Sequence, residues 1–261
     1  QYYNDVSGVT MNNVSLQNCI APWGDLIVQS TGSVAMNAGN TSLKSLVLWA
    51  NGGADATGVT FYTAGGSQLD RAVLASNYTI SNQVVDIVDA AGLGLARFTA
   101  GKLYVSTASA AGAFERAIGA SSDGDVIYVE DGAATVLTTA ITKSITFSGN
   151  FNITASNIPT DSTATAVLSS FMTRLAPGYT ATANVSGMNA NQLAAVAANG
   201  SAFTTLTYPP VQVVSGGNPS GYFTTIQAGI DFATAGDTVN VAAGSYAETL
   251  TIAKALTLDG A

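Results

Sequence analysis

The sequence predicts an all-β fold, a parallel β-helix in which short strands wind into stacked coils, with short capping helices and duplicated modules. One observation is a repeat, because a helix-like segment followed by Gly124 and Asp125 returns about 110 residues later, before Gly236 and Asp237. The other is the alternation of turn residues with apolar segments of about three or four residues. Repeated short strands without an evident hairpin indicate coils of parallel strands.

Each copy of the repeat is expected to contain a short helix, a Gly-Asp turn and three short strands. In the second copy, Ile226, Ile230 and Ala233 fall on one face of a helix over 224–233. The strands expected after this helix span 238–241, 250–252 and 256–258. Apolar and polar side chains alternate along each of them, which is typical of strands with one buried face. An immunoglobulin-like sandwich with an incidental helix is the alternative for the same segments.

The chain is expected to divide into four parts. The region before the first copy has the same short apolar segments without the helix, and the region between the copies is a spacer with one helix. Asn189 is expected to cap that helix, with Leu193 and Val196 on its apolar face. The expected parts are a β-helix-like or other all-β region (1–108), a first β-helix module with its capping helix (109–152), the spacer (153–210) and a second β-helix module (211–261), truncated or completed by a neighbour.

Composition excludes several classes of function. Charged residues make up 9% of the chain, and its net charge is −8, so nothing in it would bind a phosphate backbone. Polar residues interrupt every apolar stretch, which predicts that no helix spans a membrane. Histidine is absent, which removes Ser-His-Asp and Cys-His catalysis and histidine-ligated metal sites. Cys19 is the single cysteine and forms no internal disulfide.

The second copy resembles a known family. Residues 223–260 read FTTIQAGIDFATAGDTVNVAAGSYAETLTIAKALTLDG, and this segment resembles the opening of pectin-lyase-like right-handed β-helix domains. In that family a helix caps the N-terminal end of the solenoid, and the Gly-Asp turn leads into the first coil. Residues 114–149 resemble the same opening more weakly, and residues 183–199 are similar to segments of long, repetitive bacterial surface proteins, including adhesins and S-layer-like proteins. The resemblance implies a right-handed parallel β-helix.

No set of catalytic residues or cofactor ligands emerges from the sequence. Calcium is the ion that an acidic, histidine-free chain is equipped to bind, through carboxylates gathered at one end of a coil. The residues proposed for such a calcium site are Asp123, Asp125, Glu130 and Asp131. Capping of the Gly-Asp turns is the alternative role for the aspartates. Lys143 and Lys254 recur at equivalent places and are interpreted as solvated turn residues rather than as catalytic bases.

The function that we expect is that of an extracellular structural or adhesive protein of the bacterial cell surface, which assembles with copies of itself into a filament or lattice. Further partners would be polysaccharides or glycans, and nucleic acid is not expected. Because the chain opens at Gln1 without an initiating Met or a signal peptide, we expect a processed protein or a fragment of a longer one. The alternative is a β-helix protein that binds or cleaves polysaccharides, with carboxylates or basic residues converging in a groove beside exposed aromatic residues.

Overall fold

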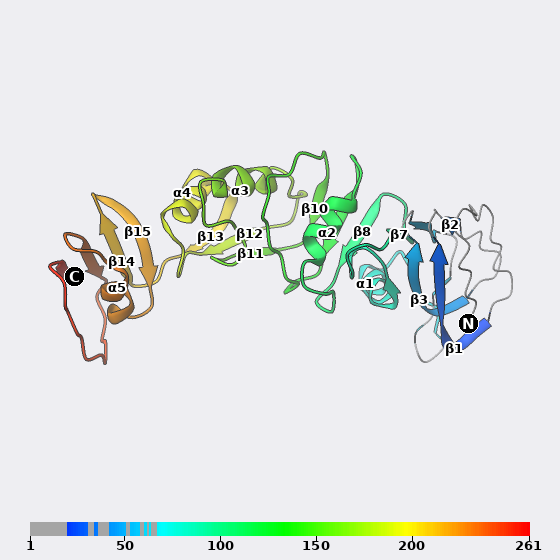
Figure 1. Ribbon diagram of the computed structural model, residues 1–261, viewed down its shortest axis with the longest axis horizontal. Helices are drawn as coiled ribbons and strands as arrows, with labels where there is room; N and C mark the ends of the chain where they lie inside the picture. The colour runs from blue at the N-terminus through cyan, green and yellow to red at the C-terminus, as the bar shows by residue number, and fades with distance from the viewer. Residues whose placement is uncertain are drawn as a thin grey trace. The chain divides into compact units, whose positions relative to one another are not determined.

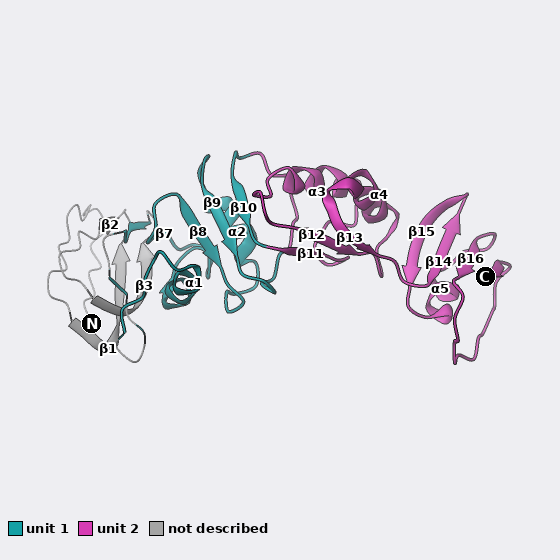
Figure 2. Cartoon of the chain, turned by 180° about the vertical axis from the view of Figure 1, so that it is seen from behind, with its two compact units in different colours: residues 1–135, 143–149 teal, residues 136–142, 150–261 magenta. Residues whose placement is uncertain are grey.

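The computed structural model describes residues 20–30, 34–35, 42–50, 53–57, 60–61, 63 and 67–261, and Cys19 lies outside this part of the chain. The chain separates into two compact units (Figure 2). The first contains residues 1–135 and 143–149, and the second contains residues 136–142 and 150–261. The division into four parts expected from the sequence stays a prediction.

The first unit holds three small sheets whose described strands are all parallel (Figure 1). One sheet contains β1 (Ile20–Ser30), β3 (Ser42–Ala50), β5 (Thr60–Phe61) and β6 (Val84–Val85). Another contains β2 (Val34–Ala35), β4 (Ala54–Asp55) and β7 (Ala96–Arg97). The third has the order β10-β9-β8, from β8 (Lys102–Val105), β9 (Val126–Val129) and β10 (Thr146–Ser148). The described helices of the first unit are α1 (Leu74–Gln83) and α2 (Ala113–Ala120).

The second unit holds two sheets of different kinds. Three parallel strands make the first, β11 (Phe151–Ile153), β12 (Ala181–Asn184) and β13 (Phe203–Thr207). They are joined through α3 (Ala164–Met172), α4 (Ala190–Ala198) and a 3-10 turn (Gly200–Ala202). The second sheet is mixed, with the order β15-β14-β16-β17, from β14 (Val211–Ser215), β15 (Asn218–Phe223), β16 (Thr238–Val241) and β17 (Thr257–Gly260). Helix α5 (Ile226–Phe232) packs against β14, β15 and β16.

The duplicated segments form the same local structure. In the first copy α2 is followed by β9 and β10, which pair in parallel, and in the second copy α5 is followed by β16 and β17, which also pair in parallel. The apolar face predicted for the second helix is confirmed, because Ile226, Ile230 and Ala233 are all buried, together with Val211, Val213 and Val239 of the sheet. The segment 250–252, expected to be a strand, is irregular. Each module therefore has one strand fewer than the sequence predicts.

The predicted right-handed parallel β-helix is wrong, and so is the all-β class. The described residues form a mixed α/β fold in which helices lie between strands and the sheets are small and separate (Figure 1). Parallel neighbours cannot be joined by a tight turn. Helices supply some of the crossovers, since α2 leads from β8 to β9, α3 from β11 to β12 and α4 from β12 to β13, whereas long irregular segments join β9 to β10 and β16 to β17. The helices expected to cap a solenoid are therefore the connections of β-α-β units.

An antiparallel hairpin also breaks the predicted pattern. Strands β14 and β15 pair antiparallel, and β14 pairs antiparallel with β16. The two residues between β14 and β15 are Gly216 and Gly217, with φ angles of 57° and 85°. Two consecutive residues with positive φ give the turn that matches the twist of a two-residue hairpin, and glycine adopts them without strain.

Among the described residues, no helix combines the length and the apolar composition that crossing a bilayer requires.

Candidate functional site

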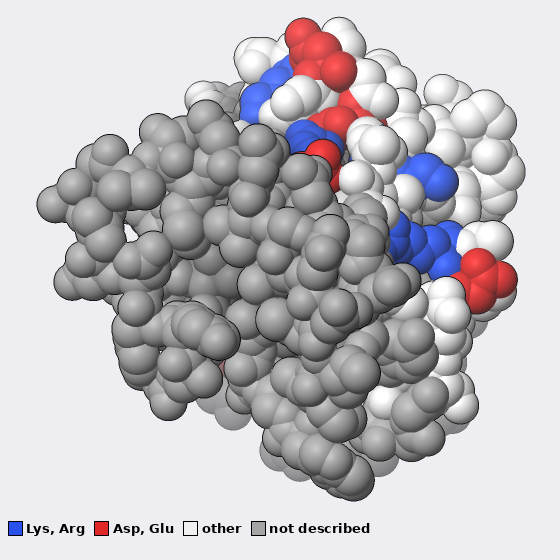
Figure 3. All heavy atoms as spheres, turned by 90° about the vertical axis from the view of Figure 1, so that its right-hand side faces the viewer, with Lys and Arg blue, Asp and Glu red and all other residues white. Residues whose placement is uncertain are grey.

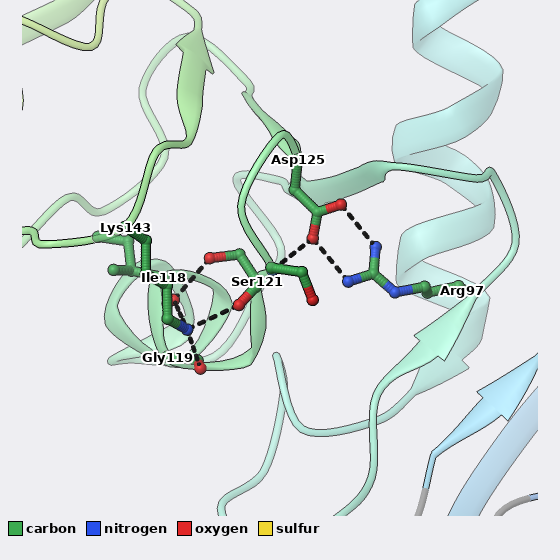
Figure 4. Close-up of polar contacts among 7 residues, drawn as sticks. Arg97, Ile118, Gly119, Ser121, Asp125 and Lys143 are labelled. Carbon is green, nitrogen blue, oxygen red and sulfur yellow. Dashed lines mark hydrogen bonds and ion pairs between the residues drawn. The ribbon is translucent and has the colours of Figure 1, made fainter.

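The most connected group of charged side chains in the described residues surrounds the Gly-Asp turn of the first copy (Figure 4). Arg97, on β7, donates from Nη1 to Oδ1 of Asp125 over 3.1 Å and from Nη2 to Oδ2 over 2.6 Å. Two parallel bonds between a guanidinium and a carboxylate fix both groups in one plane. The Ser122 amide donates to the same Oδ2 over 2.7 Å. Asp125 therefore joins the start of β9 to β7 and closes the turn that precedes it.

These contacts set the charge state of Asp125. Burial pushes the pKa of this carboxyl group upward, but the hydrogen bonds from Arg97 and from the Ser122 amide outweigh burial and hold its pKa below the ordinary value. The side chain of Asp125 is 7% exposed and that of Arg97 is 26% exposed. The group is thus a charged, largely buried pair whose donors and acceptors face each other.

Lys143 completes this group from the other side of the turn. Its Nζ donates to the carbonyl oxygens of Ile118 over 2.9 Å, Gly119 over 2.5 Å and Ser121 over 2.7 Å (Figure 4). These carbonyls lie at the C-terminal end of α2, where oxygens lack partners within the helix and carry the negative end of its dipole. Three donors on one ammonium group match three such acceptors. Lys143 is therefore a helix cap supplied from a distant segment, and the interpretation as a solvated turn residue is wrong.

The second copy contains an equivalent lysine cap and an equivalent turn aspartate, with one change. Lys254 Nζ donates to the carbonyls of Asp231 over 2.8 Å and Ala233 over 2.5 Å, at the end of α5. Asp237 accepts from the amide and the hydroxyl of Thr234 at 2.8 and 2.9 Å. The amide hydrogen bond from Thr234, followed by a bond from Ser215, lowers the pKa of Asp237 below its ordinary value. A serine at the end of β14 thus takes the place that Arg97 has in the first copy.

A carboxylate also binds the opposite end of α5. Glu248 accepts from the amides of Ile226 and Gln227, both at 2.9 Å. Amides in the first turn of a helix have no partner within it, and they carry the positive end of the dipole. Glu248 and Lys254 lie in the irregular segment between β16 and β17. This one segment therefore neutralises both ends of the helix.

Three of the four residues proposed for calcium, Asp123, Asp125 and Glu130, accept hydrogen bonds from different partners. Asp123 accepts from the Ser144 amide over 2.8 Å, and Glu130 accepts from the amide and the hydroxyl of Thr107 at 2.8 and 2.9 Å. Strand β9 separates Asp123 and Asp125 from Glu130 and Asp131, and four extended residues span about 13 Å. No three acidic or cysteine side chains gather as metal ligands within the described residues. Calcium binding stays a prediction without a formed site.

A second buried carboxylate, Asp86, organises the loop between β6 and β7. The side chain is 5% exposed and accepts from the amides of Val88 and Ala96, both at 2.8 Å. Burial raises the pKa of Asp86 to about 7, although the hydrogen bonds from Ala96 and Val88 pull it down. Arg116 of α2 holds the same loop by donating to the carbonyls of Val88 and Asp89 at 2.9 and 3.0 Å. Asp86 therefore stabilises this loop through its hydrogen bonds, and its pKa is raised well above the ordinary value.

A column of aromatic rings runs across the strands of the first unit. The rings of Phe98 and Tyr104 stack with centroids 5.1 Å apart, and those of Tyr104 and Tyr128 stack with centroids 5.3 Å apart. The Lys102 ammonium lies 5.4 Å from the centroid of the Tyr128 ring. Tyr128 is partly exposed, whereas Phe98 and Tyr104 are buried. The column is a packing feature of the core rather than an open aromatic platform.

One open pocket of about 460 Å³ lies beside the start of α1. Its described lining residues are Thr57, Thr60, Phe61, Gln68, Leu69, Asp70 and Arg71. The guanidinium of Arg71 donates to the carbonyls of Thr57 and Ala56 and lies 5.9 Å from the centroid of the Phe61 ring. Among the described lining residues Asp70 is the one carboxylate, whereas polysaccharide hydrolysis generally uses a pair. The polar side chains of the lining offer hydrogen-bond partners to hydroxyl groups, such as those of a sugar. The alternative that the chain binds polysaccharides stays a prediction.

Sequence reasoning found the aspartates and lysines of the repeated turns but missed their partners. Arg97 lies 28 residues before its acceptor Asp125, and Arg116 lies 28 and 27 residues after its acceptors Val88 and Asp89. No local sequence pattern links residues so far apart. Glu248 offered a signal, because an acidic residue in the loop before Lys254 suits a helix whose first turn carries no acidic residue of its own. The repeated lysine was also a signal, since a cation that recurs at nearly the same distance beyond a recurring helix suits the C-terminal carbonyls of that helix.

No family model, curated protein or solved structure matches the chain. The resemblance of 223–260 to pectin-lyase-like modules extends no further than the local order of helix, Gly-Asp turn and strand, and the assignment of the chain to that family, or to the repetitive surface proteins, is wrong.

Proposed function

We propose that this chain is an extracellular structural protein of the bacterial cell surface and that copies of it assemble with one another. The proposal needs a chain whose charged groups serve its own fold and whose surface carries little charge to keep copies apart.

The observation that carries the proposal is the use of the basic side chains. Every Lys and Arg whose side chain is described contacts another group of its own unit. The contacts are Arg71 with the carbonyls of Ala56 and Thr57, Arg97 with Asp125, Lys102 with the Tyr128 ring, Arg116 with the carbonyls of Val88, Asp89 and Ala111, Lys143 with three carbonyls of the α2 end, Arg174 with the Ser170 carbonyl, and Lys254 with two carbonyls of the α5 end. Charges bound in this way stabilise elements and do not converge on a substrate.

The surface supports the same reading. Charged residues make up 9% of the chain, against roughly 25% in ordinary soluble domains. In the view of Figure 3 the basic and acidic side chains that are described lie interspersed among uncharged residues. A surface of hydroxyls and amides with few charged groups carries a low density of charge to repel other copies.

Sedimentation velocity and negative-stain electron microscopy of the purified chain, over a hundredfold range of concentration, test this proposal. We expect sedimentation coefficients that increase with concentration, and regular polymers or sheets in the images. A single species with the 26.3 kDa mass of one chain at every concentration would contradict it. Polymers with the thickness of one copy would support it, and amorphous aggregates that bind an amyloid dye would count against it.

A further inference from the structure

The two copies of the repeat differ in how much apolar surface they leave open. Ile141, Ile145 and Phe147 of the first copy are 6%, 3% and 0% exposed. The residues at the same places in the second copy are Ile252, Leu256 and Leu258, and of these Ile252 is 48% and Leu258 40% exposed. The same positions are thus covered by protein in one module and open to solvent in the other. The comparison shows that this face of the module can be buried by protein.

The open face continues into an unpaired strand edge. Strand β17 pairs with β16 along one side, and no described strand lies along its other side. All four of its residues are exposed. An exposed strand edge carries a row of free amide and carbonyl groups, which pair readily with another strand.

The hydrogen bonds to β16 show which groups of this edge are free. The Thr257 amide donates to Asp237 over 2.9 Å, the Ala261 amide donates to Val241 over 3.1 Å, and the Ala255 carbonyl accepts from Gly236 over 2.8 Å. The odd-numbered residues therefore point toward β16. Because successive residues of a strand point to opposite sides, the amides and carbonyls of residues 256, 258 and 260 point outward.

We propose that β17 pairs antiparallel with β17 of a second copy about a two-fold axis through Leu258. This inference rests on the self-association proposed above and identifies one surface that takes part in it. A two-fold contact joins copies in pairs, so a polymer or sheet also needs a second contact elsewhere on the chain. Residues that lie opposite each other in an antiparallel pair have their side chains on the same face of the sheet. An axis between two residues would pair neighbours whose side chains lie on opposite faces, so the two-fold axis must pass through a residue. An axis at Leu258 places all the outward groups of residues 256 to 260 in register and forms about six main-chain hydrogen bonds.

The side chains fit this register. Leu258 lies opposite the partner's Leu258, and Leu256 lies opposite the partner's Gly260, which leaves room for the larger side chain. Asp259 is the one charged residue of the strand, and it lies opposite the partner's Thr257 on the other face, so that no two carboxylates face each other directly. A surface that is complementary to itself needs no second kind of partner, and two-fold contacts are the commonest in assemblies of identical chains.

Disulfide trapping tests the register. In a Cys19→Ser background, Leu258→Cys would place two thiol-bearing residues with Cα atoms about 5.5 Å apart, within the range of a disulfide. Thr257→Cys is the matched control, since its Cα would be about 8 Å from its counterpart and its side chain would lie on the other face. Mild oxidation should link most of the Leu258→Cys protein into dimers and at least fivefold less of the Thr257→Cys protein. Equal trapping of the two variants would overturn the proposed register.

Association measurements test the edge itself. Gly260→Pro removes an outward amide and leaves the hydrogen bonds to β16 in place, and Leu258→Lys puts a charge opposite the same charge in the partner. Each should weaken association by at least about tenfold in sedimentation experiments. Val73→Lys, which changes an equally exposed apolar residue of the first unit, should leave association unchanged. Circular dichroism of each variant checks that it is folded.

The outcomes separate this inference from the proposed function. If the unmodified chain associates and neither Leu258→Lys nor Gly260→Pro weakens it, another surface is responsible, and the pairing of β17 is overturned while the proposed function stands. If the unmodified chain is a single monomeric species, both are overturned. If association weakens in these two variants and not in Val73→Lys, the pairing is supported.

Discussion

The recurring lysines bind the C-terminal ends of two helices. Lys143 donates to three carbonyls at the end of α2, and Lys254 donates to two at the end of α5. Each ammonium group therefore replaces the water that would otherwise solvate a helix end, and it interacts favourably with the helix dipole. The role of each lysine follows from the carbonyl oxygens that its ammonium group contacts, not from how exposed the side chain is.

Lys143→Met tests this role. The methionine keeps the apolar stem and loses the donors, so we expect the free energy of unfolding to fall by about 1.5 to 3 kcal/mol, the range for hydrogen bonds to a charged group. Lys254→Met should cost less, since two carbonyls are affected instead of three. Urea unfolding followed by circular dichroism measures both. A loss for Lys254→Met that exceeds the loss for Lys143→Met would contradict this account.

Asp86 predicts a dependence of stability on pH with an uncommon sign. Because its pKa in the folded protein is about 7, above the ordinary value of 3.8, the folded state binds more protons than the unfolded state between these pH values. Its contribution to stability is therefore full below about pH 4 and is lost as the pH rises to about 7. Unfolding measured in urea from pH 5 to 8 should show the wild type losing stability. Asp86→Asn cannot titrate and should lose less over the same range.

The contribution of Asp125 to stability depends on pH in the opposite direction. Its pKa in the folded protein is lowered, so its contribution is present above the ordinary value of 3.8 and is lost as the pH falls through the folded pKa. The acid side of the stability profile should therefore steepen below about pH 4. Asp125→Asn removes this dependence together with the ion pair to Arg97. If the acid side of the profile is the same in Asp125→Asn as in the wild type, other carboxylates dominate acid unfolding.

Among the elements, the two modules differ in how closely neighbouring strands approach. A Cβ atom at Gly149, just after β10, would lie 2.5 Å from the backbone oxygen of Val129. The equivalent Gly260, in β17, has nothing within 4 Å of such an atom. The first module therefore needs glycine for a close contact between strands, and the second does not.

Gly149→Ala and Gly260→Ala form a matched pair of variants. We expect Gly149→Ala to destabilise the protein by about 1 to 3 kcal/mol, because the added methyl group forces backbone apart. Gly260→Ala should leave stability within about 0.5 kcal/mol of the wild type, as for an open surface position. Thermal unfolding followed by circular dichroism distinguishes them. Similar melting temperatures for the two variants would show that β10 can shift without cost.

Elements with a local signal could be predicted from the sequence, and their assembly could not. Helix α4 begins at the predicted Asn189, whose side chain accepts from the Gln192 amide over 3.0 Å, and Leu193 and Val196 are buried as expected. Helices α1 and α3 carry no charged cap or acidic first turn and were missed. The hairpin of β14 and β15 had a readable signal in Gly216-Gly217 between apolar segments.

The candidate site shows the same division. The Gly-Asp turns are local, because Asp125 accepts from Ser122 and Asp237 from Thr234, each three residues earlier. The partner of Asp125 on β7 depends on which strands pair, and short strands with similar apolar patterns allow several pairings. The expectation of stacked coils came from the same ambiguity. A repeat identifies a unit, but it does not determine how the parallel neighbours of that unit are connected.

For the whole molecule, net charge predicts how association responds to solution conditions. The chain carries a charge of −8 at pH 7 and has a pI near 4.1. Lowering the pH from 7 to 5 reduces the repulsion between copies, and raising the salt concentration at pH 7 screens it. We expect both changes to strengthen self-association in sedimentation velocity. Dissociation on adding salt would instead indicate that ion pairs between copies hold the assembly together.

The lysine caps also bear on how the chain folds. Lys143 reaches acceptors 22 to 25 residues earlier in the sequence, and Lys254 reaches acceptors 21 and 23 residues earlier. Each module thus closes a short loop of its own, and short loops have a small closure entropy and form quickly. The entropy cost of this contact is set by the span between the lysine and its helix, and it does not grow with the length of chain around the module. Each copy of the module therefore brings its own closing contact, in the form of one lysine.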